Sequence, residues 1–258
     1  MPFFLKSLWQ ALLETIFPAR CLICGSYNCE RHSFSSDDSD LITEPTIGYF
    51  CESCRKDLVP ITSPFCSRCG FPFVSREGDN HVCSECLAEE KYFRKARAFG
   101  VYDGALMEAI HLFKYGKKTA LSYPLSALVK KTFFCYWDRD SIDLLVSVPL
   151  HIRRLRERRF NQAHLLITSW AKKEKIPFDG LVLSRTRWTQ PQTALSRSER
   201  QGNIKGAFFL RHPGKIKGRK IMLVDDVYTT GSTVNECARI LMKGGAELVD
   251  VLTLARAV

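Results

Sequence analysis

Beyond residue 95 the chain alternates between short apolar runs and segments whose apolar residues repeat at helical spacing. Four apolar runs predict buried strands, at 98–102, 144–148, 221–224 and 248–254. Three stretches with helical periodicity predict helices, at 120–134, 162–173 and 235–243. Another helix is expected after Asp103, a typical N-cap residue. This alternation predicts a doubly wound, mostly parallel α/β sheet over residues 95–258.

Residues 1–94 follow a different pattern, and we expect them to form a separate small domain. The stretch 1–17 repeats apolar residues at helical spacing and ends at Pro18, which predicts an amphipathic helix. Gln10 and Glu14 interrupt its apolar run, so it does not fit a signal peptide. This helix caps the small domain or, alternatively, docks on a partner or a membrane surface. No run of eighteen apolar residues occurs, so we expect no transmembrane segment. Because the stretch 1–17 does not fit a signal peptide, we expect a cytoplasmic protein.

Cysteine spacing is the strongest signal in this small domain. Eight of the eleven Cys form four Cys-x-x-Cys pairs, namely Cys21/Cys24, Cys51/Cys54, Cys66/Cys69 and Cys83/Cys86. Two thiolates on one tight turn bind one side of a tetrahedral zinc ion, and two such turns complete a four-sulfur site. Gly25 and Gly70 each follow a pair, at a position where positive φ lets main-chain N–H groups point at sulfur. The pattern predicts one or two structural zinc ions.

The order of the pairs indicates how they combine. Sequential closure joins the first pair to the second and the third to the fourth. The insert 26–48 between the first two pairs is rich in Ser and Asp and is typical of a flexible loop. It also holds Cys29 and His32, which form an alternative ligand pair for the first site. Four sulfurs leave no open position for water, so the zinc would replace a core rather than catalyse.

Positive charge is concentrated in one block. The whole chain has 38 Lys and Arg against 27 Asp and Glu, and residues 151–220 hold 18 of those cations but only four acids. Such a block suggests a polyanion as partner, either nucleic acid or a small phosphorylated ligand. The alternative is a set of solvated loops and faces.

The run at 221–224 leads directly into a polar motif. Two carboxylates, Asp225 and Asp226, come first. The turn that follows carries small hydroxyls and a glycine: Thr229, Thr230, Gly231, Ser232 and Thr233. Main-chain N–H groups at the start of a helix suit a phosphate monoester, and paired carboxylates can accept hydrogen bonds from sugar hydroxyls. The motif predicts a ribose 5-phosphate site, and the lack of Gly-Lys-Ser/Thr disfavours a nucleotide P-loop.

This motif resembles that of the type I phosphoribosyltransferases, which bind phosphoribosyl pyrophosphate with Mg²⁺. The resemblance implies that Asp225 and Asp226 hold the ribose hydroxyls as catalytic residues and that residues 229–233 bind the 5-phosphate. The order of motifs along nearly the whole chain is more specific. The order is four cysteine pairs, His111–Gly116, Pro149–Gln162, Gln192–Phe208 and then residues 229–233, and it resembles the ComF family of competence-associated proteins. That family has a double zinc ribbon before a phosphoribosyltransferase domain.

Two further segments complete the predicted site. The resemblance implies pyrophosphate contacts after the strand at 144–148, from Pro149, His151, Arg153, Arg159 and Asn161. Arg154 and Arg158 are expected to face outward. The polar segment 187–208 resembles the flexible loop that closes over substrate, with Gln192, Arg200 and Asn203 in the family pattern. The alternative for this segment is a hairpin with a charged surface.

Two functions remain open. The ComF resemblance implies a competence protein for DNA uptake in natural transformation, which binds phosphoribosyl pyrophosphate and Mg²⁺. Single-stranded DNA or a DNA-uptake helicase would be its partner. The alternative is an active type I phosphoribosyltransferase, a pentosyltransferase acting on a nucleobase-like or other acceptor in nucleotide metabolism. Catalysis there needs positioning and electrostatics and no nucleophile triad.

Overall fold

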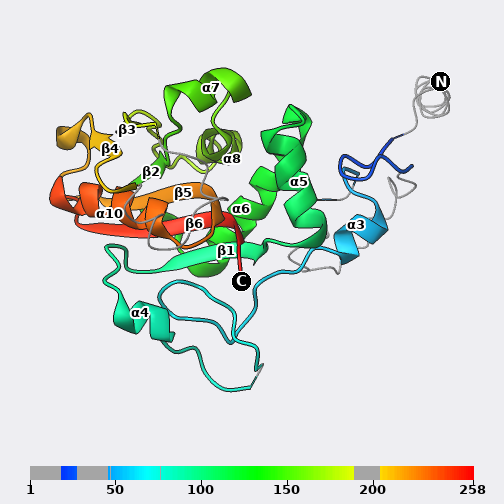
Figure 1. Cartoon of the computed structure of the whole chain (residues 1–258), viewed down its shortest axis with the longest axis horizontal. Helices are drawn as coiled ribbons and strands as arrows, with labels where there is room; N and C mark the ends of the chain where they lie inside the picture. The colour runs from blue at the N-terminus through cyan, green and yellow to red at the C-terminus, as the bar shows by residue number, and fades with distance from the viewer. Residues whose placement is uncertain (1–18, 28–45, 47, 76, 189–203) are drawn as a thin grey trace, which may run out of the picture.

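A four-stranded parallel sheet forms the centre of the computed structural model, which describes residues 19–27, 46, 48–75, 77–188 and 204–258 (Figure 1). Its strands lie in the order β1 (Ala96–Val101), β6 (Leu248–Arg256), β5 (Lys220–Tyr228) and β2 (Leu144–Ser147). Every neighbouring pair is parallel, as the alternation of runs predicts. The predicted helix 1–17 lies outside the described residues.

Helices connect these strands and cover the sheet. The longer ones are α5 (Gly104–Lys114), α6 (Ser122–Tyr136), α8 (Gln162–Ala171) and α10 (Ser232–Lys243). The shorter ones are α3 (Glu52–Lys56), α4 (Ser84–Ala88) and α7 (Ile152–Arg158). An antiparallel pair, β3 (Leu183–Arg185) and β4 (Phe208–Leu210), lies apart from the main sheet. Among the described helices none has the length and apolarity needed to cross a bilayer.

Alternate residues of β5 face two separate cores. Met222 and Val224 pack with buried side chains of α5, α6 and α8. Ile221 and Leu223 pack with buried side chains of α10 on the opposite face. This follows from the two-residue repeat of a strand, and it explains why the run is apolar throughout. A buried parallel strand needs apolar residues toward both faces.

β5 and α10 are longer than their apolar patterns predict. β5 continues through Asp225 and Asp226 to Tyr228, because its ladder with β6 continues as far as the pair Tyr228 and Arg256. α10 begins at Ser232 instead of 235. The polar motif therefore occupies the end of the strand and the first turn of the helix, with only a short turn between them.

The cysteine-rich segment covers the open edge of β1 and contributes to both cores. Main-chain hydrogen bonds join Val101 N to Val59 O at 2.9 Å and Ala96 N to Arg68 O at 2.7 Å. Such cover protects a strand edge from pairing with another chain. Cys21 and Cys54 belong to the core of α5 and α6, whereas Cys66 belongs to the core of α10. Figure 1 accordingly shows α3 beside α5, and α4 beyond β1. The domain boundary expected after residue 94 stays a prediction.

Asp250 is the fully buried acid of β6, and we predict that its removal destabilises the fold. Its carboxylate accepts Trp137 Nε1–H at 2.6 Å and Arg94 Nε–H at 3.1 Å. Asp250→Ala would leave the buried Trp137 N–H without its acceptor, whereas the half-exposed Arg94 can turn to water, so the free energy of unfolding should fall by about 1–3 kcal/mol in urea titration. Asp140→Ala is the control, because the exposed Asp140–Arg139 pair should contribute less than about 1 kcal/mol. Equal effects of the two substitutions would contradict this assignment.

Candidate functional site

The turn after β5 brings main-chain N–H groups and small hydroxyls close together. It ends at Gly231, the N-cap of α10, whose φ of 75° is left-handed. Thr230 Oγ1 and Ser232 Oγ lie 2.9 Å apart, so both hydroxyls belong to the same turn. The first N–H groups of a helix lack partners within the helix, and the helix dipole is positive there. This turn has the chemistry of a phosphate-binding loop, and we call residues 229–233 the phosphate loop.

Asp225 and Asp226 place two carboxylates beside this loop. Asp225 Oδ1 accepts the N–H of Asp226 at 2.9 Å, and Lys114 Nζ from α5 lies 2.8 Å from Asp226 Oδ1. Burial, together with the charge of Asp226, raises the pKa of the Asp225 carboxyl to about 7. A carboxyl with a raised pKa lacks sufficient cationic partners, so a bound cation would favour its ionised form. The pair therefore fits a divalent cation with oxygen ligands.

A cavity of about 540 Å³ opens between the end of β5, the end of α5 and α7. Its wall includes six of the predicted residues: Pro149, Asp225, Asp226, Thr229, Gly231 and Thr233. Thr230 and Ser232 line a neighbouring cavity of about 320 Å³, which Gly231 also borders. The structure thus brings together the carboxylates and most of the phosphate loop at the carboxyl edge of the sheet, where ligands of α/β proteins usually bind.

Five cationic residues also line the large cavity: Lys114, Lys117, Arg154, Arg158 and Arg185. The Arg158 guanidinium lies 4.9 Å from the ring centre of Tyr115, which borders the same cavity. Guanidinium groups donate hydrogen bonds in a planar fork that matches phosphate oxygens. The cavity therefore combines a site for a phosphate and hydroxyls with cations for further anionic oxygens.

Four residues that the resemblance implies for pyrophosphate do not line this cavity. Arg153 and Arg159 are exposed, and Arg159 ends α7 with a φ of 68°. Asn161 Nδ2 donates to Val148 O at 2.9 Å. His151 is buried, and its Nδ1 accepts the N–H of Arg153 at 3.2 Å as the N-cap of α7. These contacts are structural, and ligand roles for the four residues stay predictions.

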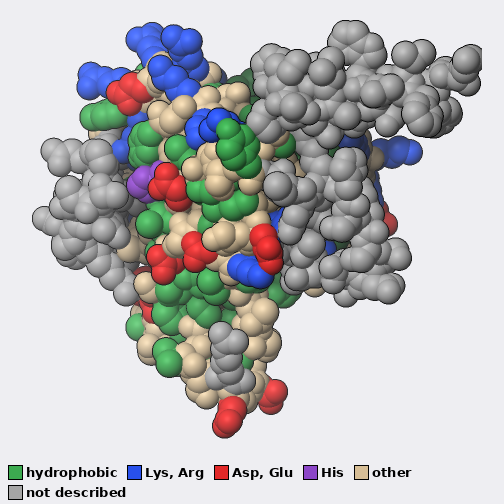
Figure 2. Space-filling model, turned by 90° about the vertical axis from the view of Figure 1, so that its right-hand side faces the viewer, with side chains coloured by type: hydrophobic (Ala, Val, Ile, Leu, Met, Phe, Trp, Pro, Cys, Tyr) green, Lys and Arg blue, Asp and Glu red, His purple; other side chains and the backbone are tan. Residues whose placement is uncertain are grey.

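Arg154 and Arg158 line the cavity instead of facing outward as expected. Residues four apart share one face of a helix, and Ile152–Arg158 is helical here. Because this polar stretch lacks an apolar period, its sequence predicts no helix, and the spacing of the two arginines carries no signal by itself. The remaining α7 cations face solvent. Figure 2 shows Lys and Arg side chains gathered at the upper end of one face, at the height where Figure 1 places α7.

The proposed closing loop falls largely outside the described residues, including Gln192, Arg200 and Asn203. Its two ends are described, and they are held together by the antiparallel pair β3 and β4. Arg185 and Trp188 at the first end both line the large cavity. Arg153 and Arg154 each place a guanidinium 5.5 Å from the Trp188 ring centre. The segment 187–208 therefore begins at the cavity and returns beside its starting point.

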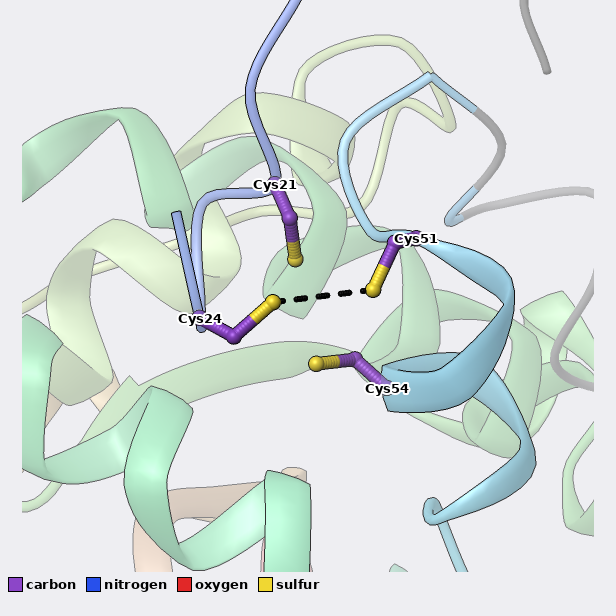
Figure 3. A group of neighbouring side chains, drawn as sticks. All are labelled: Cys21, Cys24, Cys51 and Cys54. Carbon is purple, nitrogen blue, oxygen red and sulfur yellow. Dashed lines mark hydrogen bonds between the residues drawn. The ribbon is translucent and has the colours of Figure 1, made fainter. Parts of the chain in front are cut away.

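The first four-cysteine cluster joins the turn of Cys21 and Cys24 to α3. Its four sulfurs point toward one another in Figure 3, and each lies within 4.8 Å of the others. Cys24 Sγ lies 3.6 Å from Cys51 Sγ. The Ser26 hydroxyl, 2.8 Å from Cys24 Sγ, lowers the pKa of the Cys24 thiol to about 6, which favours the thiolate. This cluster is complete without Cys29 and His32, which lie outside the described residues.

The second cluster has the same design around Cys66, Cys69, Cys83 and Cys86. The N–H groups of Cys69 and Cys83 donate to Cys66 Sγ at 3.4 and 3.3 Å. Gly70 has a φ of 70°, and its N–H donates to Cys66 O, as Gly25 does to Cys21 O in the first cluster. The sequential pairing of the turns is therefore confirmed, and so is positive φ at both glycines.

Both clusters fit zinc. Zinc–sulfur bonds of about 2.3 Å in a tetrahedron place the sulfurs about 3.8 Å apart. The separations of 3.6 Å for Cys24–Cys51 and 3.7 Å for Cys69–Cys83 agree with that spacing, and all four sulfurs of each cluster lie within 4.8 Å of one another. Four thiolates without a carboxylate or water ligand are the donor set of a structural zinc site. Each cluster would hold zinc as part of the fold.

Comparisons with known proteins match both halves of the chain. Residues 12–87 match the double zinc ribbon domain family, and residues 163–257 match the phosphoribosyl transferase domain family. The DNA utilization protein YhgH of Escherichia coli is 34% identical over 80% of this chain and 89% of its own length. Competence protein F of Haemophilus influenzae is 32% identical over 80% and 90%. Competence protein ComFC of Bacillus subtilis is 30% identical over 80% and 83%.

Solved structures align more loosely. The allosteric regulatory enzyme of purine biosynthesis aligns over 54% of this chain and 25% of its own, at 18% identity and a TM-score of 0.34. Glutamine phosphoribosylpyrophosphate amidotransferase from B. subtilis aligns over 56% and 27%, at 18% identity and a TM-score of 0.33.

We predict two zinc ions per chain, one in each cluster. Cys51→Ser/Cys54→Ser and Cys66→Ser/Cys69→Ser should each reduce the content to one, because two thiolates do not hold structural zinc. Elemental analysis of protein purified without chelator measures this directly. Cys135→Ser is the control, since Cys135 is exposed and belongs to neither cluster. A wild-type content of one zinc would contradict the assignment of one cluster.

Proposed function

The chain belongs to the ComF family of competence-associated proteins, and we propose that it serves DNA uptake through a site for phosphoribosyl pyrophosphate and Mg²⁺. The observation that carries this proposal is the large cavity, where paired carboxylates, the phosphate loop and five cationic side chains meet. The relatives named as DNA utilization and competence proteins support the role in DNA uptake.

Each part of the cavity suits one part of the ligand. The main-chain N–H groups and hydroxyls of the phosphate loop would bind the 5-phosphate. Asp225 and Asp226 would accept hydrogen bonds from the ribose hydroxyls and, with them, hold Mg²⁺. The metal ion would supply charge neutralisation of the pyrophosphate. Arg154, Arg158 and Arg185 would bind the remaining pyrophosphate oxygens from the opposite wall.

Lys114 has a positioning role in this proposal. Its ion pair with Asp226 at 2.8 Å holds one carboxylate near the end of β5, so that the ribose hydroxyls meet a fixed acceptor. The pair also balances part of the negative charge before a ligand arrives. Because positioning and charge supply most of the rate enhancement for pyrophosphate displacement at C1, these residues would be sufficient for it without a nucleophile.

Turnover onto a nucleobase-like acceptor is the second candidate function. It is favoured by two aromatic side chains that border the cavity, Tyr115 and Trp188, which are 65% and 36% exposed. Exposed rings of this kind can stack on a planar base. The chain would then be a type I phosphoribosyltransferase, and the same site would bind the same phosphoribosyl donor.

Binding of phosphoribosyl pyrophosphate should depend on both carboxylates. Asp225→Asn/Asp226→Asn keeps the side-chain shapes but removes the charges that hold the hydroxyls and Mg²⁺. Charge-assisted hydrogen bonds contribute about 1.5–3 kcal/mol each, so affinity should fall about tenfold or more. Titration calorimetry with Mg²⁺ measures this, and Asp179→Asn, at an aspartate outside the cavity wall, is the control. Equal affinity of the double variant and the wild type would reject the site.

Single-stranded DNA is the partner that we propose for the exposed cations of α7 and the block around it. Arg153, Arg156 and Arg159 are exposed there, outside the cavity wall. Backbone binding by several cations releases counterions, so the affinity depends steeply on salt. A DNA-uptake helicase is the alternative partner, and it would leave the chain without DNA affinity of its own.

Two double variants separate DNA binding from ligand binding. Arg153→Glu/Arg156→Glu should flatten the plot of log affinity against log salt, by about 0.7 for each phosphate that the variant no longer neutralises, and weaken phosphoribosyl pyrophosphate binding less than a change in the cavity wall does. Arg154→Glu/Arg158→Glu should weaken binding of that small ligand, because both residues line the cavity. Gel-shift series over salt, with oligothymidine as probe, provide the slopes. Absence of a shift at low salt would rule out direct DNA contact and favour the helicase.

A further inference from the structure

Arg256, at the end of β6, connects the second cysteine cluster to β5. It is buried, with only 3% of its surface exposed. Its Nη2 donates to Cys69 Sγ at 3.4 Å, and its guanidinium lies 4.1 Å from the ring centre of Tyr228. The ring of Phe71, just after the Cys66–Cys69 turn, lies 5.3 Å away from the same guanidinium. Arg256 thus lies between a predicted zinc ligand and the last residue of β5.

The charge of the second cluster explains why a cation is buried here. Four thiolates around Zn²⁺ carry a formal net charge of about −2, because each coordinating thiol is deprotonated. Arg256 Nε and Nη1 are buried without hydrogen-bond partners in the described part of the chain. A buried, incompletely paired guanidinium is costly unless an anionic group lies nearby. The zinc–thiolate cluster is the anion that this arginine contacts.

Tyr228 joins Arg256 to the phosphate loop. Its hydroxyl lies against Gly231, and a Cβ on Gly231 would clash with that oxygen. Gly231 has left-handed φ and is the N-cap of α10, so its position sets the direction of the N–H groups that follow. The Tyr228 ring lies between the arginine and this glycine. A shift of Arg256 would therefore displace the Tyr228 ring, and with it the contact between Tyr228 and Gly231.

Two hydrogen bonds also join the cysteine-rich segment to α10. Asn235, in the first turn of α10, accepts the N–H of Tyr92 at 2.8 Å and donates to Glu90 O at 3.0 Å. Residues 90–92 follow directly after the second cluster. The cysteine-rich segment therefore contacts the first turn of α10 directly, and it reaches Gly231 through Arg256 and Tyr228.

We propose that the second cluster, when its thiolates hold zinc, fixes the phosphate loop in its binding conformation through Arg256 and Tyr228. Arg256 is then a positioning residue for a site that it does not itself contact. The coupling is reciprocal, because a ligand that binds the ordered loop must also stabilise the zinc-bound cluster by the same factor. The part of this proposal that concerns phosphoribosyl pyrophosphate rests on the proposed function. The part that concerns loop order does not.

Hydrogen exchange on the zinc-loaded full chain tests the proposal without any ligand. In Arg256→Met the amides of residues 229–235 should exchange about tenfold faster than in the wild type, the effect of losing one charge-assisted contact. Zinc release to a chromophoric chelator should accelerate in the same variant. Arg256→Lys keeps the charge, so its zinc release should be closer to that of the wild type than in Arg256→Met.

Arg97→Met is the matched control. Arg97 on β1 also holds the second ribbon, through a bond from Nη2 to Ser67 O at 3.0 Å, but no contact joins it to Tyr228 in the described part of the chain. This variant should release zinc faster and leave exchange at 229–235 unchanged. Unchanged exchange at 229–235 in Arg256→Met would overturn the proposal. Equally fast exchange there in both variants would overturn it too, because general loosening of the ribbon would then explain the effect.

A binding measurement distinguishes failure of this proposal from failure of the proposed function. If the wild type binds phosphoribosyl pyrophosphate with Mg²⁺, Arg256→Met should bind it about tenfold more weakly, and equal affinity would count against the coupling. If the wild type does not bind it, the proposed function fails. The exchange and zinc-release results then still decide whether the cluster orders the loop.

Discussion

The position of β5 between β6 and β2 determines where each part of the site lies. A central parallel strand has neighbours on both edges and packed cores on both faces, so its residues can reach solvent and ligand only where it ends. Asp225 and Asp226 occupy that end, and the turn to α10 follows directly. The carboxylates and the N–H groups thus come from one continuous segment. The cations of the cavity wall come from α5, the turn after it, α7 and β3, which meet at the same edge of the sheet.

The cysteine-rich segment packs against the sheet and also contains two clusters that would bind metal. Metal coordination would replace a hydrophobic core at each cluster. The sheet then supplies further burial, because Cys54 packs with α5 and α6 while Cys86 packs in the core of α10. Main-chain pairing along β1 closes the interface. The ribbons and the sheet therefore share cores, and a change at a cluster can reach the phosphate loop within a few side chains.

The sequence predicts local features well and distant contacts poorly. Apolar runs locate all four strands of the main sheet, and Cys-x-x-Cys spacing locates both clusters, since each depends on neighbouring residues. The sequence does not show that Arg154 and Arg158 face inward, because an arginine-rich helix such as α7 has no apolar period that would reveal its inner face. Arg185 reaches the cavity from an antiparallel pair whose partner strand begins 23 residues later, at Phe208. The sequence gives no sign that Arg256 contacts Cys69, because the two residues are far apart along the chain and meet only through the position of β6.

We propose that the end of β5 binds phosphoribosyl pyrophosphate with Mg²⁺. A crystal structure of the zinc-loaded chain grown with both would test this most directly. The account predicts the 5-phosphate on the N–H groups of residues 229–233 and the ribose hydroxyls on Asp225 and Asp226. It also predicts pyrophosphate oxygens facing Arg154, Arg158 or Arg185. A phosphate loop without the 5-phosphate, with the ligand bound instead on the exposed cations of α7, would contradict it.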